Sequence, residues 1–234
     1  MSKSKESGHI NKVVSAVIIW ILYIIWLLKI SSIVPTVGNF IIHLLFLGIV
    51  IFVFKDDLIS NLKEFKVDKK KKIFRIFLYF IGFLVIMLIS NGLISFFTSI
   101  MGIDLAKDSS SKALSDVFVQ VPYGTLFACF LTIVFYPIVE ELIFRKSLRP
   151  AIKNGVLFVI ITSLLSWYFQ VTLLNPSVNE FVLAIQTFLN SIFMAIIYVK
   201  TNNIIYTISS RMLFNIFICI MQLGILIFSY NAYK

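Results

Sequence analysis

The sequence predicts an all-α fold, a polytopic membrane helix bundle with about seven transmembrane helices. The first observation is composition, because 59% of the 234 residues are hydrophobic and 14% are charged, with a mean hydropathy of +0.98. A soluble domain of this length does not tolerate that balance. The second observation is that apolar runs near the 20 or so residues needed to cross a bilayer recur along the chain. The third is that basic residues cluster between these runs, as in multi-pass membrane proteins.

The N-terminal region, residues 1–98, is expected to hold a short tail and the first three spans. The tail, residues 1–12, carries lysines ahead of an apolar run at 13–33. This order resembles a signal sequence, but no small-residue cleavage site follows, so the run is predicted to be a retained first helix. A turn around Pro35 then leads into a second, shorter run at 38–54.

The third run, residues 73–98, is longer than a bilayer requires, which predicts a tilted helix. The basic segment before it, 55–75, is predicted to be a cytoplasmic loop, because basic residues near span ends favour the cytoplasmic side. The basic residues at 145–153 and Lys200 give the same orientation. The N-terminus is therefore expected in the cytoplasm of a multi-pass cell-membrane protein, with residues 99–121 as an outer loop.

The C-terminal region, residues 122–230, is predicted to form a membrane core of four spans. Polar residues within them, such as Asn190 and Ser191, are expected to hydrogen-bond between helices. Cys129 and Cys219 both lie within apolar runs and are predicted to be small packing residues, not a disulfide or a metal pair. The runs of this region are 122–144, 156–174, 181–199 and 203–229.

The first run of this core ends in the hexapeptide Glu-Glu-Leu-Ile-Phe-Arg, residues 140–145. A charged residue inside a membrane span costs about 2.5–3.5 kcal/mol on insertion scales, so such a group is retained for an ion pair or for chemistry. Glu141 and Arg145 lie four residues apart on one helix face and can pair, whereas Glu140 points about 100° away. These three residues alone leave both explanations open.

The Glu-Glu-x-x-x-Arg pattern at the end of a span, in a small protein rich in Phe, Leu and Ile, resembles the first motif of the CPBP family. This family comprises the CAAX proteases and bacteriocin-processing enzymes, also called the Abi family of intramembrane proteases. The resemblance covers about residues 124–224. It implies a Phe-x-x-x-His motif on the next span and a His-x-x-x-Asn or His-x-x-x-Asp motif on the last. In such enzymes the first glutamate activates a water molecule, and the histidines and Asn position that water or a metal and stabilise the oxyanion.

The first motif is matched in full, but both family histidines are replaced in this chain. In the second motif, Ser166 stands at the aromatic position and Gln170 at the histidine position. In the third motif, Arg211 stands at the histidine position, and Asn215 is retained four residues later on the same helix face. By the resemblance, the candidate catalytic residues, or the remains of a former site, are Glu140, Glu141, Arg145, Gln170, Arg211 and Asn215.

Helix lengths predict that these residues meet at one depth in the membrane. Glu140 lies roughly 15–20 Å from the turn at Lys153, and Gln170 roughly 24 Å beyond that turn, at 1.5 Å per residue. Asn215 lies roughly 18 Å past Asn203 by the same measure. All three are therefore expected to line one cavity on the inner side of the bilayer midplane.

Neither histidine of the chain is expected to restore the lost chemistry. His9 lies in the N-terminal tail, and His43 lies close to the outer end of the second span, where a helix-packing role is expected. Gln170 can donate and accept hydrogen bonds but cannot take up a proton. Arg211 is a permanent cation that binds no metal and would weaken Glu140 as a general base. We therefore expect Arg211 to lock the former active site into a structural polar cluster.

Two functional hypotheses follow. The first is a non-catalytic CPBP-like membrane protein acting through protein partners, such as regulation of a sensor kinase or cell-envelope enzyme, or bacteriocin self-immunity. The second is an active CAAX-type intramembrane endopeptidase in which Glu140 and Glu141 activate water and Gln170 is an oxyanion donor. No cofactor is expected, and a divalent metal comes into question only under the second hypothesis. The expected partners are the lipid bilayer and a membrane protein or peptide. Nucleic acid is not expected, because most of the net charge of +10 lies in the basic loop.

Overall fold

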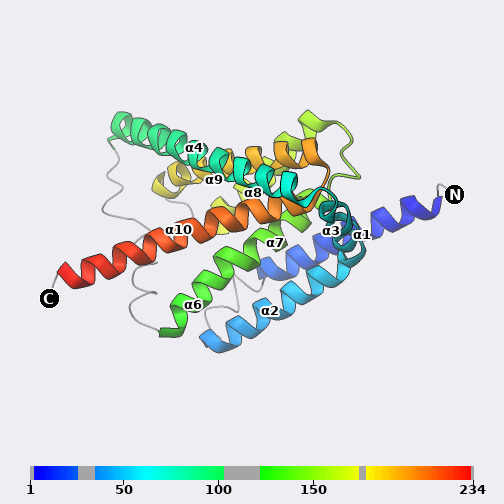
Figure 1. The fold of residues 1–234 in the computed structure, drawn as a ribbon, viewed down its shortest axis with the longest axis horizontal. Coiled ribbons are helices and arrows are strands. Elements are labelled where there is room, and N and C mark those ends of the chain that lie inside the picture. Colours follow the sequence, from blue (N-terminus) through cyan, green and yellow to red (C-terminus); the bar gives the residue numbers. More distant parts are fainter. Residues whose placement is uncertain (1–2, 26–34, 103–121, 174–177, 233–234) are drawn as a thin grey trace.

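The computed structural model describes residues 3–25, 35–102, 122–173 and 178–232, which are almost entirely helical and contain no strand (Figure 1). The predicted all-α membrane fold is confirmed. The elements are α1 (Lys3–Ile25), α2 (Thr36–Val53), α3 (Lys55–Lys66), α4 (Lys69–Met101), α6 (Pro122–Phe130), η2 (Leu131–Phe135), α7 (Tyr136–Glu140), η3 (Glu141–Lys146), α8 (Gly155–Leu173), α9 (Val178–Thr201) and α10 (Ile204–Ala232).

Four helical segments are long and apolar enough to cross a membrane: α4, the segment from α6 to η3, α9 and α10. The pair α2 and α3, bent by 73°, would make a fifth span if it counted as one. The apolar stretches described in α1 and α8 are shorter. The predicted number of seven spans is therefore not established. Part of the first predicted run, 13–33, and most of the predicted outer loop, 99–121, lie outside the described residues.

The segment 55–75, predicted as a basic loop, is helical and forms α3 and the first turns of α4. The chain turns sharply at Phe54, whose backbone angles (φ −100°, ψ 12°) are not those of a helix. The Asn61 amide oxygen accepts a hydrogen bond of 3.0 Å from the backbone N–H of Ile204, and Asn203 Nδ2 donates to the Asn61 carbonyl at 3.0 Å. Because the first N–H groups of a helix have no partner within it, α3 caps the N-terminus of α10.

Helix α10 runs through the middle of the molecule between two groups of helices (Figure 1). On one side, α4 packs against α9 and α10, and α9 packs against α8. On the other side, α10 contacts η2, α7 and η3, and α2 contacts α7. Side chains on opposite faces of α10 therefore reach both groups.

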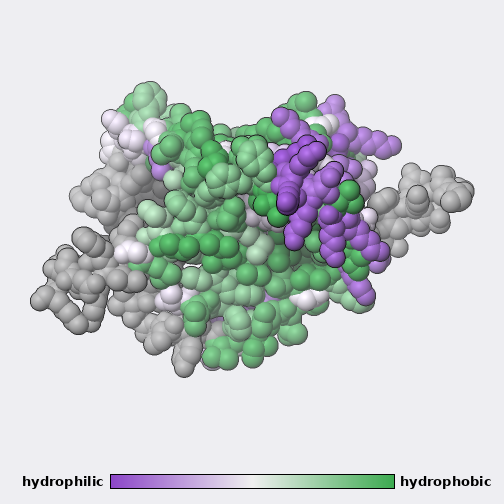
Figure 2. Space-filling model, viewed as in Figure 1, coloured by the Kyte–Doolittle hydropathy of each residue, from purple (hydrophilic) through white to green (hydrophobic). Residues whose placement is uncertain are grey.

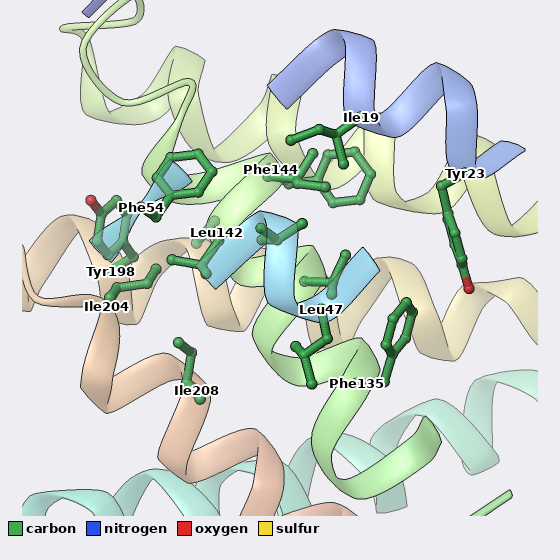
Figure 3. Packing of buried hydrophobic residues seen from close by; sticks show 14 of the residues in the cluster. Ile19, Tyr23, Leu47, Phe54, Phe135, Leu142, Phe144, Tyr198, Ile204 and Ile208 are labelled. Atoms are coloured by element: carbon green, nitrogen blue, oxygen red, sulfur yellow. The ribbon is translucent and has the colours of Figure 1, made fainter. Parts of the chain in front are cut away.

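Two hydrophobic clusters both include residues of α10. The larger contains Tyr23 of α1, Val50 of α2, Phe135 of η2 and Leu142 of η3 among its most buried members (Figure 3). The smaller joins α4, α9 and α10, with Phe83 1% exposed at its centre. Large apolar side chains elsewhere on α2, α4 and α8 are exposed, as a lipid-facing surface requires. Figure 2 shows the hydrophilic residues of this face gathered at one end, over α3 and the start of α4.

The segment from α6 to η3 is one helix with two widened π turns. In the first, the N–H of Tyr136 donates to the carbonyl of Leu131, five residues earlier. In the second, the N–H of Ser147 donates to the carbonyl of Leu142 at 3.0 Å. The first π turn lies directly before Pro137. Proline has no N–H to donate, and its ring clashes with the carbonyl four residues earlier in a regular helix, so the helix widens at this point.

Candidate functional site

The charged side chains of the hexapeptide lie where the bent helix meets α10. Glu140 ends α7, and Glu141 and Arg145 belong to η3. Glu141 is 0% and Arg145 1% exposed, and Arg145 Nη1 lies 2.8 Å from Glu141 Oε1. The pair predicted from the four-residue spacing is therefore present and fully buried.

Arg211 of α10 joins this pair from the opposite side. Its Nη2 lies 2.7 Å from Glu140 Oε2, and its Nη1 lies 3.4 Å from Glu141 Oε1. One carboxylate oxygen of Glu141 is thus shared between Arg145 and Arg211. We call these four residues, Glu140, Glu141, Arg145 and Arg211, the charged cluster. Two carboxylates and two guanidinium groups make it neutral in sum, which reduces the cost of placing it within the bundle.

Arg145 also connects the charged cluster to α9. Its Nη2 donates to Ser191 Oγ at 2.9 Å and to the Ser191 carbonyl at 3.2 Å. Ser191 is 4% exposed. The expectation that this serine hydrogen-bonds between helices holds, but its bond to Arg145 was not foreseen. Through these contacts one arginine joins η3 to α9, and Arg211 joins both to α10.

Asn215, one turn after Arg211, binds the backbone of η2 and not the charged cluster. Its Nδ2 donates to the carbonyl of Thr132 at 2.6 Å. Within its own helix this carbonyl receives no hydrogen bond, because the N–H of Tyr136 donates to the Leu131 carbonyl and Pro137 has no N–H. A partly buried carbonyl within a membrane bundle still needs a partner, and Asn215 supplies it. The family motif predicts Asn215 at the site, whereas its contact with the Thr132 carbonyl has a single sequence signal, Pro137.

The other predicted positions are less closely tied to the charged cluster. Gln170 lies in α8, but its side chain is outside the described part of the chain. His43 is buried in α2, where its Nδ1 lies 2.7 Å from the carbonyl of Asn39 and its ring lies edge-on to Tyr23. These contacts fit the expected packing role. The side chain of His9 is also outside the described residues.

A polar cavity of about 120 Å³ adjoins the charged cluster between α4, η3, α8, α9 and α10. Both arginines line it, whereas neither glutamate is among its lining residues. Its volume exceeds the 10–15 Å³ or so that one water molecule needs. Of the charged cluster, therefore, the two arginines line the cavity and the two glutamates do not. The lining residues are Phe83, Arg145, Ser166, Thr187, Asn190, Ser191, Met194, Arg211, Phe214 and Asn215.

These residues do not fit a divalent metal ion. Among the described residues, no group of three or more His, Cys, Asp or Glu side chains could hold one. The two carboxylates that lie together are bound by guanidinium groups, at 2.7 Å for Glu140 and 2.8 Å for Glu141. A metal would have to displace permanent cations, which are not ligands themselves.

Comparison with known families agrees with the resemblance inferred from the motif. Residues 122–217 match the family model described as type II CAAX prenyl endopeptidase Rce1-like. The matched segment runs from the start of α6 to Asn215 and beyond, so it contains the whole charged cluster and the cavity except Phe83. Searches of curated proteins and of solved structures gave no match.

Proposed function

We propose that this membrane protein, Rce1-like over residues 122–217, is a non-catalytic member of the CPBP family that acts through protein partners. One observation carries the proposal: the Arg211 guanidinium bridges both glutamates, 2.7 Å from Glu140 and 3.4 Å from Glu141. The family places an imidazole at this position, which can accept and release a proton near neutral pH. A guanidinium group remains protonated and cannot exchange a proton with a reacting group.

The state of the two glutamates also supports this proposal. A general base must reach a water molecule with a carboxylate that is free to accept its proton. Glu140 is held by Arg211, and Glu141 is fully buried between Arg145 and Arg211. At these distances the guanidinium groups occupy one carboxylate oxygen of each glutamate. The charged cluster then serves to hold η3, α9 and α10 in a fixed arrangement.

The proposed partners are other membrane proteins. Regulation of a sensor kinase or of a cell-envelope enzyme, and bacteriocin self-immunity, are the roles that the CPBP resemblance suggests for a member without protease activity. All of them need a folded bundle in the membrane but no reacting group. The exposed apolar faces of α2, α4 and α8 offer surface for such contacts within the bilayer.

The alternative is an active CAAX-type endopeptidase that uses Glu140 and Glu141 to activate water. It is favoured by the complete Glu-Glu-x-x-x-Arg motif and by the polar cavity beside it. In addition, Glu141 Oε2 has no hydrogen-bond partner among the described residues. This alternative requires Arg211 to leave the glutamates when substrate binds.

The double variant E140Q/R211Q distinguishes the two functions. It removes one charge of each sign, keeps hydrogen-bonding groups at both positions and leaves the pair Glu141–Arg145 at 2.8 Å intact. If the charged cluster is structural, we expect a near-normal protein level in the membrane and full complementation of a deletion strain. A protease would lose its general base and fail to complement at the same protein level.

The single variant E140Q is the matched control. It removes the same carboxylate but leaves Arg211 with one partner at 3.4 Å. The structural role predicts a lower protein level than in the double variant, because a partly buried cation that has lost its closest partner destabilises the fold. Loss of complementation by E140Q/R211Q at a normal protein level would contradict the proposal.

A further inference from the structure

A second cavity lies at the end of the molecule where several helices terminate. It has a volume of about 250 Å³ and lies where α2 meets α3, where η3 ends, and where α9 ends. We call it the interfacial pocket. It lies apart from the charged cluster and has no lining residue in common with the first cavity. Its lining residues are Phe54, Asp57, Lys146, Ser147, Arg149, Pro150, Tyr198 and Asn202.

Two cationic side chains and one carboxylate face this pocket. Lys146 Nζ lies 3.4 Å from Asp57 Oδ1, and the two side chains are 19% and 22% exposed. At that distance and exposure the ion pair is weak. Arg149 is fixed more firmly, because its Nη1 donates to the carbonyls of Ile152 at 3.0 Å and Lys153 at 3.1 Å. Within the part of the chain that the structure describes, no hydrogen bond is made by Nε or Nη2 of Arg149, which lines the pocket.

Further contacts hold Arg149 in place at the pocket wall. Its guanidinium carbon lies 5.3 Å from the centre of the Phe158 ring, a cation–π distance. A guanidinium group fixed in this way loses little conformational freedom when it binds a phosphate, which its planar array of donors matches. Asn202 adds an exposed amide beside it, and Tyr198 a buried phenol.

The position of the interfacial pocket along the helices corresponds to the depth of phospholipid head groups in the membrane. The candidate spans Gly124–Lys146 and Ala184–Thr201 end at the pocket, and the span Ile204–Gly224 begins beside it. Span ends lie at the boundary between the hydrocarbon core and the lipid phosphates. The same end of the molecule carries the hydrophilic surface over α3 and the start of α4 (Figure 2). Basic pockets between helices at this level are typical binding sites for anionic head groups.

We propose that the interfacial pocket binds the phosphate of an anionic glycerophospholipid, with Lys146, Arg149 and Asn202 as donors. Asp57 then accepts hydrogen bonds from hydroxyl groups of the head group, which favours phosphatidylglycerol. The lipid would join α2–α3, η3 and α9 at one membrane surface. This inference is independent of the function proposed for the charged cluster, since no residue of that cluster takes part.

The test measures lipid binding to the full-length protein in detergent by native mass spectrometry. Phosphatidylglycerol is titrated, with phosphatidylcholine as a comparison lipid and inorganic phosphate as a soluble source of the same chemistry. We expect one tightly bound phosphatidylglycerol that phosphatidylcholine does not replace. Equal binding of the two lipids would overturn the proposal. Full displacement of the lipid by millimolar inorganic phosphate would also overturn it, because the pocket would then be a free phosphate site.

The variant N202D provides the sharpest test of position. Asn202 is exposed and has a positive φ of 49°, which Asp also adopts readily, so the fold should be unaffected. The added carboxylate is expected to weaken phosphatidylglycerol binding by about fivefold or more, in line with one charge near a membrane surface. K146Q should weaken binding to a similar extent.

K70Q is the matched control, because it changes the net charge by the same amount at an exposed position outside the pocket lining. We expect less than about a twofold change for K70Q, since a charge outside the pocket acts only through a screened field. If K70Q and N202D weaken binding equally, the basic surface as a whole attracts the lipid and the pocket proposal is wrong.

Discussion

Arg211 decides, among single residues, what the charged cluster can do. It contacts a carboxylate oxygen of Glu140 at 2.7 Å and one of Glu141 at 3.4 Å, its side chain is 22% exposed, and it lines the cavity. Breaking a buried ion pair on one side costs more than the pair contributes, because the remaining charge stays buried without compensation. The consequences of changing Arg211 should therefore appear in stability before they appear in any activity.

The variant R211M is expected to reduce the free energy of unfolding by about 3 kcal/mol, the lower end of the range for a broken buried pair. The reason is that Glu140 would lose the guanidinium group at 2.7 Å, and Glu141 would keep Arg145 alone. Unfolding by SDS in mixed micelles measures the effect. R211K should recover only part of the loss, because an ammonium group cannot bind two carboxylates through a planar fork. An R211M protein as stable as the wild type would show that the two glutamates do not depend on this arginine.

Asn215 offers a second residue-scale prediction, since it satisfies the Thr132 carbonyl at 2.6 Å. N215L is expected to cost about 1 kcal/mol, the lower end of the penalty for an acceptor without a donor, because this carbonyl is partly buried. P137A restores an N–H within reach of that carbonyl, so N215L should cost clearly less in the P137A background. A double-mutant cycle in mixed micelles measures this coupling. Equal costs in both backgrounds would refute the link between Pro137 and Asn215.

At this scale the sequence predicted which charged residues lie close together but not all of their contacts. Glu141 and Arg145 could be paired from their spacing, and the family resemblance placed Arg211 at a depth where it meets them. The bond from Arg145 to Ser191 depends on how α9 is rotated. The contact of Asn215 with a backbone carbonyl depends on a π turn, which no side-chain pattern reveals.

At the level of elements, α10 packs against η2. Two successive turns of α10 face two successive turns of the partner helix: Asn215 Nδ2 donates to the Thr132 carbonyl, and Cys219 interacts electrostatically with Cys129. Both cysteines are free thiols. The prediction that they are packing residues is compatible with this state. Whether the two thiols lie close together depends on how the two helices are aligned along their axes.

This register predicts an intramolecular cross-link. Treatment of membranes with copper phenanthroline should join Cys129 and Cys219, which mass spectrometry would detect as a loss of two alkylatable thiols without dimer formation. The reason is that the two thiols are already neighbours, so little backbone movement is needed. C219S is the control and should leave one thiol that still reacts with the alkylating reagent. Two alkylatable thiols after oxidation of the wild type would show that the register of α6 and α10 is different.

At the scale of the whole molecule, the charged cluster lies where both groups of helices meet α10. Hydrophobic burial drives helix association weakly within a bilayer, so polar contacts and close packing set the arrangement. Arg145 joins η3 to α9, Arg211 joins α7 and η3 to α10, and Asn61 joins α3 to α10. Composition sufficed to predict an all-α membrane bundle. The number of spans could not be fixed in the same way, because α2 and α3 are separated by a bend of 73° and α8 is a short apolar helix.

The orientation of the bundle yields the last prediction. The interfacial pocket brings Asp57, Lys146 and Asn202 to one end of the molecule, and the basic residues Lys70, Lys153 and Lys200 flank these segments in the chain. Because basic residues near span ends favour the cytoplasm, all three lysines should lie on the cytoplasmic side. Single-cysteine variants at these positions, in a background without Cys129 and Cys219, should resist a membrane-impermeant maleimide in intact cells and react in inverted vesicles. Labelling of any one of them in intact cells would place its basic segment on the outer side of the membrane, away from the other two. That result would contradict both this topology and the composition of the pocket.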